Sequence, residues 1–125
     1  MAQPRLSIVI PAYNEAKRIG DTLIKIHAYL MKQSGLSEIV VVDDGSTDRT
    51  ADAVRKHFPA VQVISYRPNR GKGHAVRTGM LAAKGEIRLF FDADSSTPIE
   101  ELDNVFPHIG NGADVVIGSR MVAGA

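Results

Sequence analysis

Two aspartates separated by one residue, Asp92 and Asp94, are the clearest candidates for chemistry in the 125-residue sequence. They follow the apolar segment Leu89–Phe91 directly, so two anions stand together at the edge of an expected core. Such a pair is costly unless a cation or hydrogen bonds compensate the charge. Carboxylate oxygens suit Mg²⁺ or Mn²⁺, which bridge to substrate phosphates. The alternative is a solvated turn with helix-capping aspartates, but the neighbouring motifs favour a metal site.

A second acidic run, Asp43 to Asp48, follows the apolar segment 39–42. One aspartate of this run is suited to accept a hydrogen bond from a nucleobase N–H, while Ser46 or Thr47 is predicted to cap the next helix. Turn formation and capping alone would also explain every residue of the run. Asp44 is the predicted ligand because it lies just beyond the expected strand, and Asp43 is predicted to be structural.

The segment Pro11–Glu15 follows the first apolar run of the chain. Tyr13 offers an aromatic face on which a base can stack, and Glu15 offers a polar contact. The alternative is that Asn14 caps a helix and Glu15 favours the helix dipole. The segment by itself does not choose between these two interpretations.

Glycines and cations alternate in the segment Asn69–His74, just before an expected helix. This arrangement suits phosphate binding through backbone N–H groups and the Lys72 ammonium group. It is not a dinucleotide fingerprint, because the third glycine would fall at Val76, and the sequence has no P-loop. Both absences count against a dehydrogenase and an ATPase. His74 is the only histidine near the expected cleft and a secondary candidate.

Strand and helix patterns alternate along the chain, which predicts an α/β fold. β-branched and apolar runs predict strands, and apolar residues at helical spacing predict helices. Pro11 is predicted to end the first strand, and Thr97 to cap the last helix with Pro98 in its first turn. The expected strands are 6–10, 38–43, 61–65, 87–91 and 115–117, and the expected helices are 19 to about 34, 51–58, 74–84 and 97 to about 109.

Five β–α alternations without a hairpin signal predict a Rossmann-like, mostly parallel sheet with helices on both faces. In such sheets, ligands bind outside the carboxyl ends of the strands. All the motifs above, and Gly118–Arg120 as well, lie just after an expected strand. The topology therefore predicts one shared site.

Composition narrows the class of protein further. The chain is 44% hydrophobic and 23% charged, which is typical of a globular domain, and we expect one domain over residues 1–125. A net charge of +1 gives no electrostatic argument for nucleic acid or an anionic membrane. The absence of cysteine excludes disulfides and thiolate chemistry and fits a reducing compartment. No apolar run could span a bilayer and residues 1–5 do not resemble a signal peptide, so we expect a cytoplasmic location.

Taken together, these segments and Gly118-Ser119-Arg120 resemble family-two glycosyltransferases of the GT-A fold over nearly the whole chain. Gly71-Lys72-Gly73 and Ser96-Thr97-Pro98 are most similar to members that transfer hexoses to polyprenyl or dolichyl phosphate. The resemblance implies a nucleotide-sugar donor, with UDP-glucose preferred and GDP-mannose second. It also implies a lipid-phosphate acceptor, met at the cytoplasmic face of a membrane.

The resemblance assigns roles to individual residues. The residues implied to line the nucleoside pocket, with Asp44 reading the base, are Pro11, Tyr13, Glu15, Val42 and Asp44. Asp92 and Asp94 are implied to engage the Mg²⁺ or Mn²⁺ ion on the diphosphate, directly or through water, with Ser96 nearby. Arg120 is implied to face the donor diphosphate or the acceptor phosphate, and Lys72 joins the nucleotide-binding residues from the glycine-rich segment above. No general base is identified, and an acceptor that is already an anionic phosphate does not require one.

Family members continue past the Gly118–Arg120 segment, whereas this sequence ends at Ala125. We therefore expect a nucleotide-sugar-binding domain that is truncated at its C-terminal end and self-associates through uncovered apolar surface. The alternative function is a nucleotide-binding module without turnover of its own. A nucleotidyltransferase would carry a glycine-rich basic loop after its first strand, and Pro11–Glu15 is not such a loop.

Overall fold

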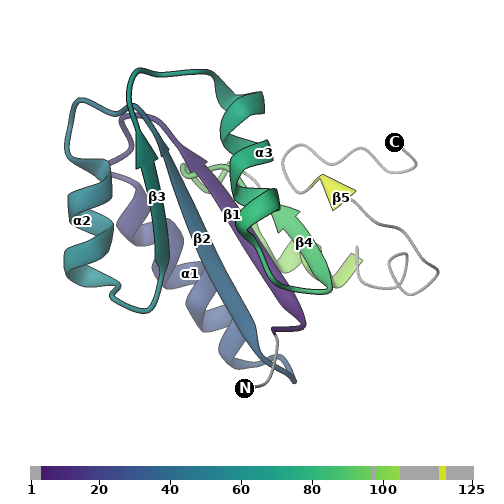
Figure 1. The fold of residues 1–125 in the computed structure, drawn as a ribbon. Coiled ribbons are helices and arrows are strands. Elements are labelled where there is room, and N and C mark those ends of the chain that lie inside the picture. The colour runs from purple at the N-terminus through teal and green to yellow at the C-terminus, as the bar shows by residue number, and fades with distance from the viewer. Residues whose placement is uncertain (1–3, 97, 105–115, 118–125) are drawn as a thin grey trace.

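A computed structural model describes residues 4–96 and 98–104, together with the backbone of residues 116–117. Five strands form a single sheet in the order β3-β2-β1-β4-β5, and each neighbouring pair is parallel. The predicted α/β fold is thus confirmed (Figure 1). The elements in chain order are β1 (Leu6–Ala12), α1 (Ile19–Met31), β2 (Ser37–Asp44), α2 (Thr50–His57), β3 (Gln62–Tyr66), α3 (Lys72–Ala82), β4 (Ile87–Phe90), a 3₁₀ helix (Ile99–Glu101) and β5 (Val116–Ile117).

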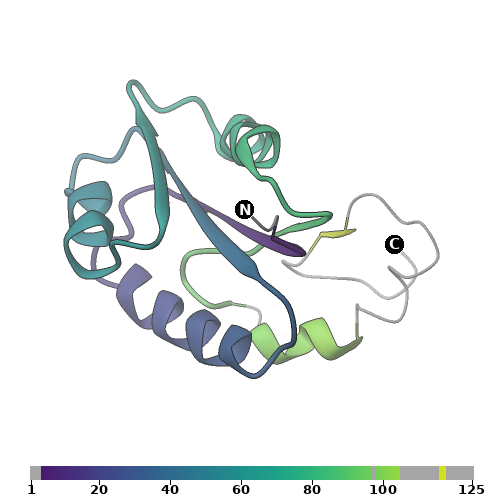
Figure 2. The same ribbon diagram turned by 60° about the horizontal axis from the view of Figure 1, so that its bottom comes forward.

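Helices cover both faces of the sheet, as Figure 2 shows: α1 and α2 lie on one side and α3 on the other. Side chains alternate along β1, so Ile8 and Ile10 pack toward α1 whereas Val9 packs toward α3. All seven residues of β1 are buried, because the strand is central in the sheet and covered on both faces. This explains why its sequence is apolar except for the buried Ser7, rather than alternating between apolar and polar residues.

The first strand does not end at Pro11, as predicted, but continues to Ala12 and pairs Pro11 with Val42 of β2. The Val9 carbonyl accepts a hydrogen bond from the Phe91 N–H at 2.9 Å, so the backbone groups of Val9 face β4. Pro11 lies two residues further and faces the same side, where β4 has already ended. Its missing N–H therefore removes no hydrogen bond from the ladder.

Smaller differences from the predicted boundaries lie near the carboxyl edge of the sheet. β3 extends to Tyr66, which pairs with Asp44, and α3 begins at Lys72 because Gly71 adopts a φ of +99° that redirects the chain. The predicted helix from residue 97 begins as a 3₁₀ helix, and its backbone stays helical over residues 102–104. The predicted cap Thr97 and residues 105–109 lie outside the described residues.

α3 packs closely on the sheet at Gly79. A Cβ atom there would collide with Val9 Cγ1 and lie 3.0 Å from Val42 Cγ2. The absence of a side chain lets α3 pack closely against β1 and β2. No helix in the described part of the chain is both long and apolar enough to cross a membrane.

Candidate functional site

The strand order reverses beside β1, because the chain passes from β3 through α3 to β4 on the other side of β1. Ligands of open α/β sheets bind at the carboxyl edge of such a switch point. A pocket of about 410 Å³ lies there, lined by segments that follow β1, β2, β3 and β4. The predicted site residues that line it are Pro11, Tyr13, Glu15, Asp44, Lys72, Asp92 and Asp94.

Among the described residues, one predicted site residue is not brought into this pocket. Val42 is fully buried under α3, in the same apolar cluster as Ala75, and does not line the pocket. The reason is its position on the strand: Val42 lies two residues before Asp44 on the same face, one step deeper in the sheet. Arg120 lies outside the described residues.

The Asp44 carboxylate accepts four hydrogen bonds from the last residue of β3 and the segment after it. Its Oδ1 accepts from the Tyr66 hydroxyl at 2.6 Å and from the Arg70 N–H at 2.9 Å. Its Oδ2 accepts from Asn69 Nδ2 at 2.8 Å and from the Gly71 N–H at 3.0 Å. Asp44 is only 3% exposed, so it anchors the loop 69–71 to the end of β2.

The environment of Asp44 also affects its neighbours. Burial, followed by the hydrogen bond to Asp44, raises the pKa of the Tyr66 phenol above its usual range, which keeps this donor protonated. The loop packs on Gly45, where a Cβ atom would collide with the backbone of Asn69. By comparison, the Asp43 carboxylate accepts one hydrogen bond, from the Ser46 N–H at 3.0 Å. The sequence predicts a structural role for Asp43. In the structure, however, the Asp44 carboxylate holds more of its surroundings in place, with four hydrogen bonds against one.

Asp92 and Asp94 are partly exposed, and the chain itself compensates their charge. Lys72 Nζ lies 2.5 Å from Asp92 Oδ1, and the Ser96 hydroxyl donates to Asp92 Oδ2 at 3.0 Å. The Ser96 N–H donates to Asp94 Oδ1 at 3.0 Å, so Ser96 orients both carboxylates. Ser95 has a φ of +58°, which makes the tight turn between the aspartates and Ser96.

The donor set at this edge suits a hard divalent cation. No group of three or more histidine, cysteine, aspartate or glutamate side chains that could hold a metal occurs among residues 4–96 and 98–104. Asp92 and Asp94 alone would therefore supply only part of a coordination sphere. Mg²⁺ fits such a site because it is usually held by one or two carboxylates, with water and substrate phosphates completing the octahedron.

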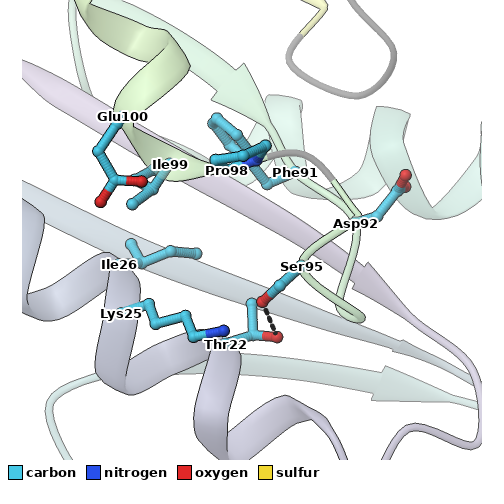
Figure 3. Close-up of a pocket in the computed structure, with 9 residues that line it drawn as sticks. All are labelled: Thr22, Lys25, Ile26, Phe91, Asp92, Ser95, Pro98, Ile99 and Glu100. Atoms are coloured by element: carbon cyan, nitrogen blue, oxygen red, sulfur yellow. Dashed lines mark hydrogen bonds between the residues drawn. The ribbon is translucent and has the colours of Figure 1, made fainter.

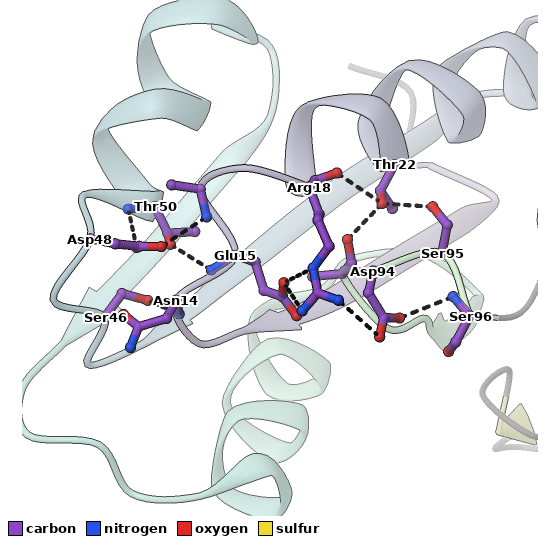
Figure 4. Close-up of polar contacts among 12 residues, drawn as sticks. Asn14, Glu15, Arg18, Thr22, Ser46, Asp48, Thr50, Asp94, Ser95 and Ser96 are labelled. Atoms are coloured by element: carbon purple, nitrogen blue, oxygen red, sulfur yellow. Dashed lines mark hydrogen bonds and ion pairs between the residues drawn. The ribbon is translucent and has the colours of Figure 1, made fainter.

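Arg18 connects the first and fourth strand-end segments (Figure 4). Its Nη2 lies 2.5 Å from Glu15 Oε1, whereas its Nη1 lies 3.9 Å from Asp94 Oδ2. The guanidinium group is therefore held mainly by Glu15 and lies only at the limit of ion-pair distance from Asp94. Its side chain is 60% exposed, so a bound ligand could readily change this arrangement.

The segment after β1 is latched to the segment after β2 by paired hydrogen bonds. The Asn14 N–H donates to Ser46 Oγ at 2.9 Å, and the Thr47 N–H donates back to Asn14 Oδ1 at 2.8 Å. Asn14 has a φ of +53°, and the preceding Tyr13 lines the pocket and is 48% exposed. The prediction that Ser46 or Thr47 caps the next helix is wrong, since the cap position of α2 is Arg49.

A second pair of contacts extends this latch to α2 (Figure 4). The Glu15 N–H donates to Thr50 Oγ1 at 3.1 Å, and the Ala16 N–H donates to Asp48 Oδ2 at 3.1 Å. Burial acts to raise the pKa of Asp48, but hydrogen bonds from Thr50 and Ala16 outweigh it and lower the pKa below its usual value. The sequence analysis missed these contacts; the only signal was the density of short polar side chains in Ser46–Thr50.

A second pocket of about 350 Å³ lies between α1 and the segment after β4. Its apolar lining includes Ile26, Phe91 and Ile99, and the Asp92 side chain at its edge points away from the others (Figure 3). Thr22 Oγ1 donates to the Ala93 carbonyl at 2.6 Å and shares a hydrogen bond with Ser95. Thr22 thus ties α1 to the turn that carries Asp92, a contact that the sequence analysis did not predict.

Comparison with known proteins identifies relatives over most of the chain. The family described as Glycosyl transferase family 2 matches residues 7–125. Dolichyl-phosphate beta-glucosyltransferase ALG5C of Trichomonas vaginalis is 38% identical over an alignment of 127 positions, and the match covers 91% of this chain. The chain spans 38% of the length of that relative.

Solved structures of glycosyltransferases share the fold. The mannosyltransferase PcManGT from Pyrobaculum calidifontis, in complex with GDP-Man and Mn²⁺, is 36% identical with a TM-score of 0.65; the match covers 81% of this chain and 30% of that one. S. aureus TarS 1–349 in complex with UDP-GlcNAc is 32% identical with a TM-score of 0.67, over 86% of this chain and 31% of that one.

Proposed function

This chain belongs to glycosyl transferase family 2, and on that premise we propose that its carboxyl-edge pocket binds a nucleotide-sugar donor for hexosyl transfer to a polyprenyl phosphate. The observation that carries the proposal is the convergence of Tyr13, Asp44, Lys72 and the Asp92–Asp94 pair on one pocket. UDP-glucose is the preferred donor because relatives are named dolichyl-phosphate beta-glucosyltransferases, and GDP-mannose is second.

The nucleoside half of the donor would lie near Tyr13 and Asp44. The half-exposed Tyr13 ring offers a stacking face, and Asp44 is the proposed acceptor for a base N–H. A carboxylate has about four lone-pair sites, and Asp44 already fills that number. Base recognition by Asp44 therefore requires at least one donor of the loop 69–71 to be exchanged for the base.

The diphosphate half would lie between Lys72 and the two aspartates. Asp92 and Asp94 would hold the Mg²⁺ or Mn²⁺, with Ser96 orienting both carboxylates. Such an ion supplies Lewis-acid stabilisation of the negative charge on the leaving nucleoside diphosphate. Lys72 adds a second positive charge from the N-terminus of α3, where backbone N–H groups also favour anions.

The acceptor determines whether the protein must supply a base. A polyprenyl phosphate attacks through an oxygen that is already negatively charged, so no side chain has to remove a proton. Among the described residues, the carboxylates of the pocket are engaged with donors or cations, and we assign the general-base role to none of them. The proposed acceptor is therefore a phosphate, which needs no such base.

Calorimetry on the purified chain tests donor binding, with UDP and GDP each titrated in Mn²⁺ and in chelator. We expect UDP to bind more tightly than GDP, and both to need the metal. Tighter GDP binding would reverse the donor assignment, and no binding of either would overturn the proposal. Radiolabelled UDP-glucose with a polyprenyl phosphate then tests transfer, and binding without any labelled lipid would favour a nucleotide-binding module instead.

A further inference from the structure

We propose that Lys72 is the counter-cation of Asp92 in the metal-free protein, and that the divalent ion displaces it and so releases its ammonium group to the donor diphosphate. The inference rests on the proposed function, because it concerns the same pocket. It adds a coupling role for Lys72: one side chain opposes binding of the metal alone and favours binding of the metal together with the nucleotide.

The first evidence is the position of the ammonium group. Lys72 is the first residue of α3, and its Nζ lies 2.5 Å from Asp92 Oδ1 and 5.6 Å from the centroid of the Phe90 ring. The side chain thus extends across the end of β4 to reach the carboxylate. Lys72 is 56% exposed whereas Asp92 is 20% exposed, so the lysine can move away at little packing cost, but the aspartate cannot.

The second evidence is competition for the Asp92 oxygens. Oδ2 accepts from the Ser96 hydroxyl, and Oδ1 contacts Lys72, so a divalent ion approaching Oδ1 meets the ammonium group. Two cations cannot share one carboxylate oxygen at contact distance without strong repulsion. Repulsion between the two cations therefore favours withdrawal of Lys72 when a metal binds Asp92.

The two aspartates differ in this respect. The cation facing Asp94 is Arg18, which lies 3.9 Å from Asp94 Oδ2 and is held at 2.5 Å by Glu15. Arg18 therefore blocks Asp94 much less than Lys72 blocks Asp92. We infer that the ion first engages Asp94 and that displacement of Lys72 is the step that completes its binding.

The released lysine can bind the donor diphosphate. Lys72 and both aspartates line the same pocket, so the ammonium group can turn from Asp92 to a diphosphate held by the metal. Each ligand then favours the other, since the metal frees the lysine and the diphosphate binds it. Such coupling is reciprocal by thermodynamic linkage.

The test is calorimetry of Lys72→Met and wild-type chains, first with Mn²⁺ alone and then with UDP in saturating Mn²⁺. We expect Lys72→Met to bind Mn²⁺ alone roughly three- to tenfold more tightly, because a screened repulsion is removed. We expect the same variant to bind UDP about tenfold more weakly, because a charged contact is lost. A merely structural lysine would not change the two affinities in opposite directions.

Two controls isolate the charge at this position. Lys84→Met removes the same charge beyond the far end of α3, from an exposed residue, and should leave both affinities at the wild-type value. Lys72→Arg keeps the charge and should keep weak Mn²⁺ binding. Thermal unfolding confirms that each variant is folded, and Lys72→Gln replaces Lys72→Met if the apolar side chain prevents folding.

The outcomes separate this inference from the proposed function. If the wild-type chain binds Mn²⁺ and UDP but Lys72→Met leaves Mn²⁺ affinity unchanged or lowers it, the counter-cation role is refuted and the proposed function stands. If the wild-type chain binds neither ligand, both fail. Tighter Mn²⁺ binding together with weaker UDP binding supports both.

Discussion

Asp44→Asn replaces one oxygen of a buried carboxylate with an NH₂ group and removes the charge that four donors share. Oδ1 accepts from the Tyr66 hydroxyl and the Arg70 N–H, while Oδ2 accepts from Asn69 Nδ2 and the Gly71 N–H. The new amide can turn either way. In both orientations one backbone N–H, that of Arg70 or Gly71, faces another donor instead of an acceptor.

The size of the effect follows from these contacts. One hydrogen bond to a charged group contributes about 1.5–3 kcal/mol, and the bonds that remain lose their charge assistance. The loss at Asn69 is partly offset, because its Nδ2 also donates to the Asp44 carbonyl at 3.1 Å. We therefore expect the free energy of unfolding to fall by about 2–4 kcal/mol. A domain with a stability of about 5–15 kcal/mol would remain folded.

Urea unfolding at neutral pH, followed by circular dichroism, measures this loss, and Asp43→Asn is the matched control. Asp43 is also buried, but its Oδ1 accepts one hydrogen bond that an amide oxygen can still accept. We expect a loss below about 1 kcal/mol for the control. We also expect Asp44→Ala to weaken UDP binding more than Asp43→Ala does. Equal losses of stability in the two asparagine variants would refute the anchoring role of Asp44.

Three further predictions concern the metal, the packing of α3, and the hydrogen bonds by which Asp48 joins the segment after β1 to α2. Asp94→Asn should weaken nucleoside diphosphate binding in calorimetry mainly when Mn²⁺ is present, and equal wild-type affinity in Mn²⁺ and in chelator would contradict the metal assignment. Gly79→Ala should lower the free energy of unfolding by about 2–4 kcal/mol, because its methyl group collides with Val9. Gly73→Ala on the same helix is the control: its methyl group meets open space, so the free energy of unfolding should change by less than about 1 kcal/mol. Similar thermal unfolding of the two variants would argue against close packing at Gly79. Hydrogen bonds hold the pKa of Asp48 below the usual aspartate value despite burial, so its stabilising contribution is present above the unfolded-state pKa and is lost as the pH falls through the folded-state pKa. The destabilisation by Asp48→Asn in urea should therefore be larger at pH 7 than in acid, and a pH-independent difference would contradict this.

The amino-acid sequence by itself determined the types of element, their order and the edge of the sheet where the site lies. Strands buried on both faces read as continuous apolar runs, and helices read as apolar residues at helical spacing. Both signals are local, so they are visible without knowing what each element packs against. The carboxyl-edge rule for parallel sheets then placed Tyr13, Asp44, Lys72, Asp92 and Asp94 in one region. The pocket contains all of them.

The tertiary structure alone decided which polar groups contact one another within that region. The donors to Asp44 lie 22 to 27 residues further along the chain, and Ser46, Thr47 and Asp48 bond to a segment 32 or 33 residues before them. Residue types at such separations do not specify a pairing, because every short polar side chain in a turn could equally cap a helix or close the turn. Pro11 shows the same limit, since its place inside β1 depends on where β4 ends beside it. The local sequence thus determines which chemical groups lie at each strand end. The folded sheet determines which of these groups come within hydrogen-bonding distance of one another.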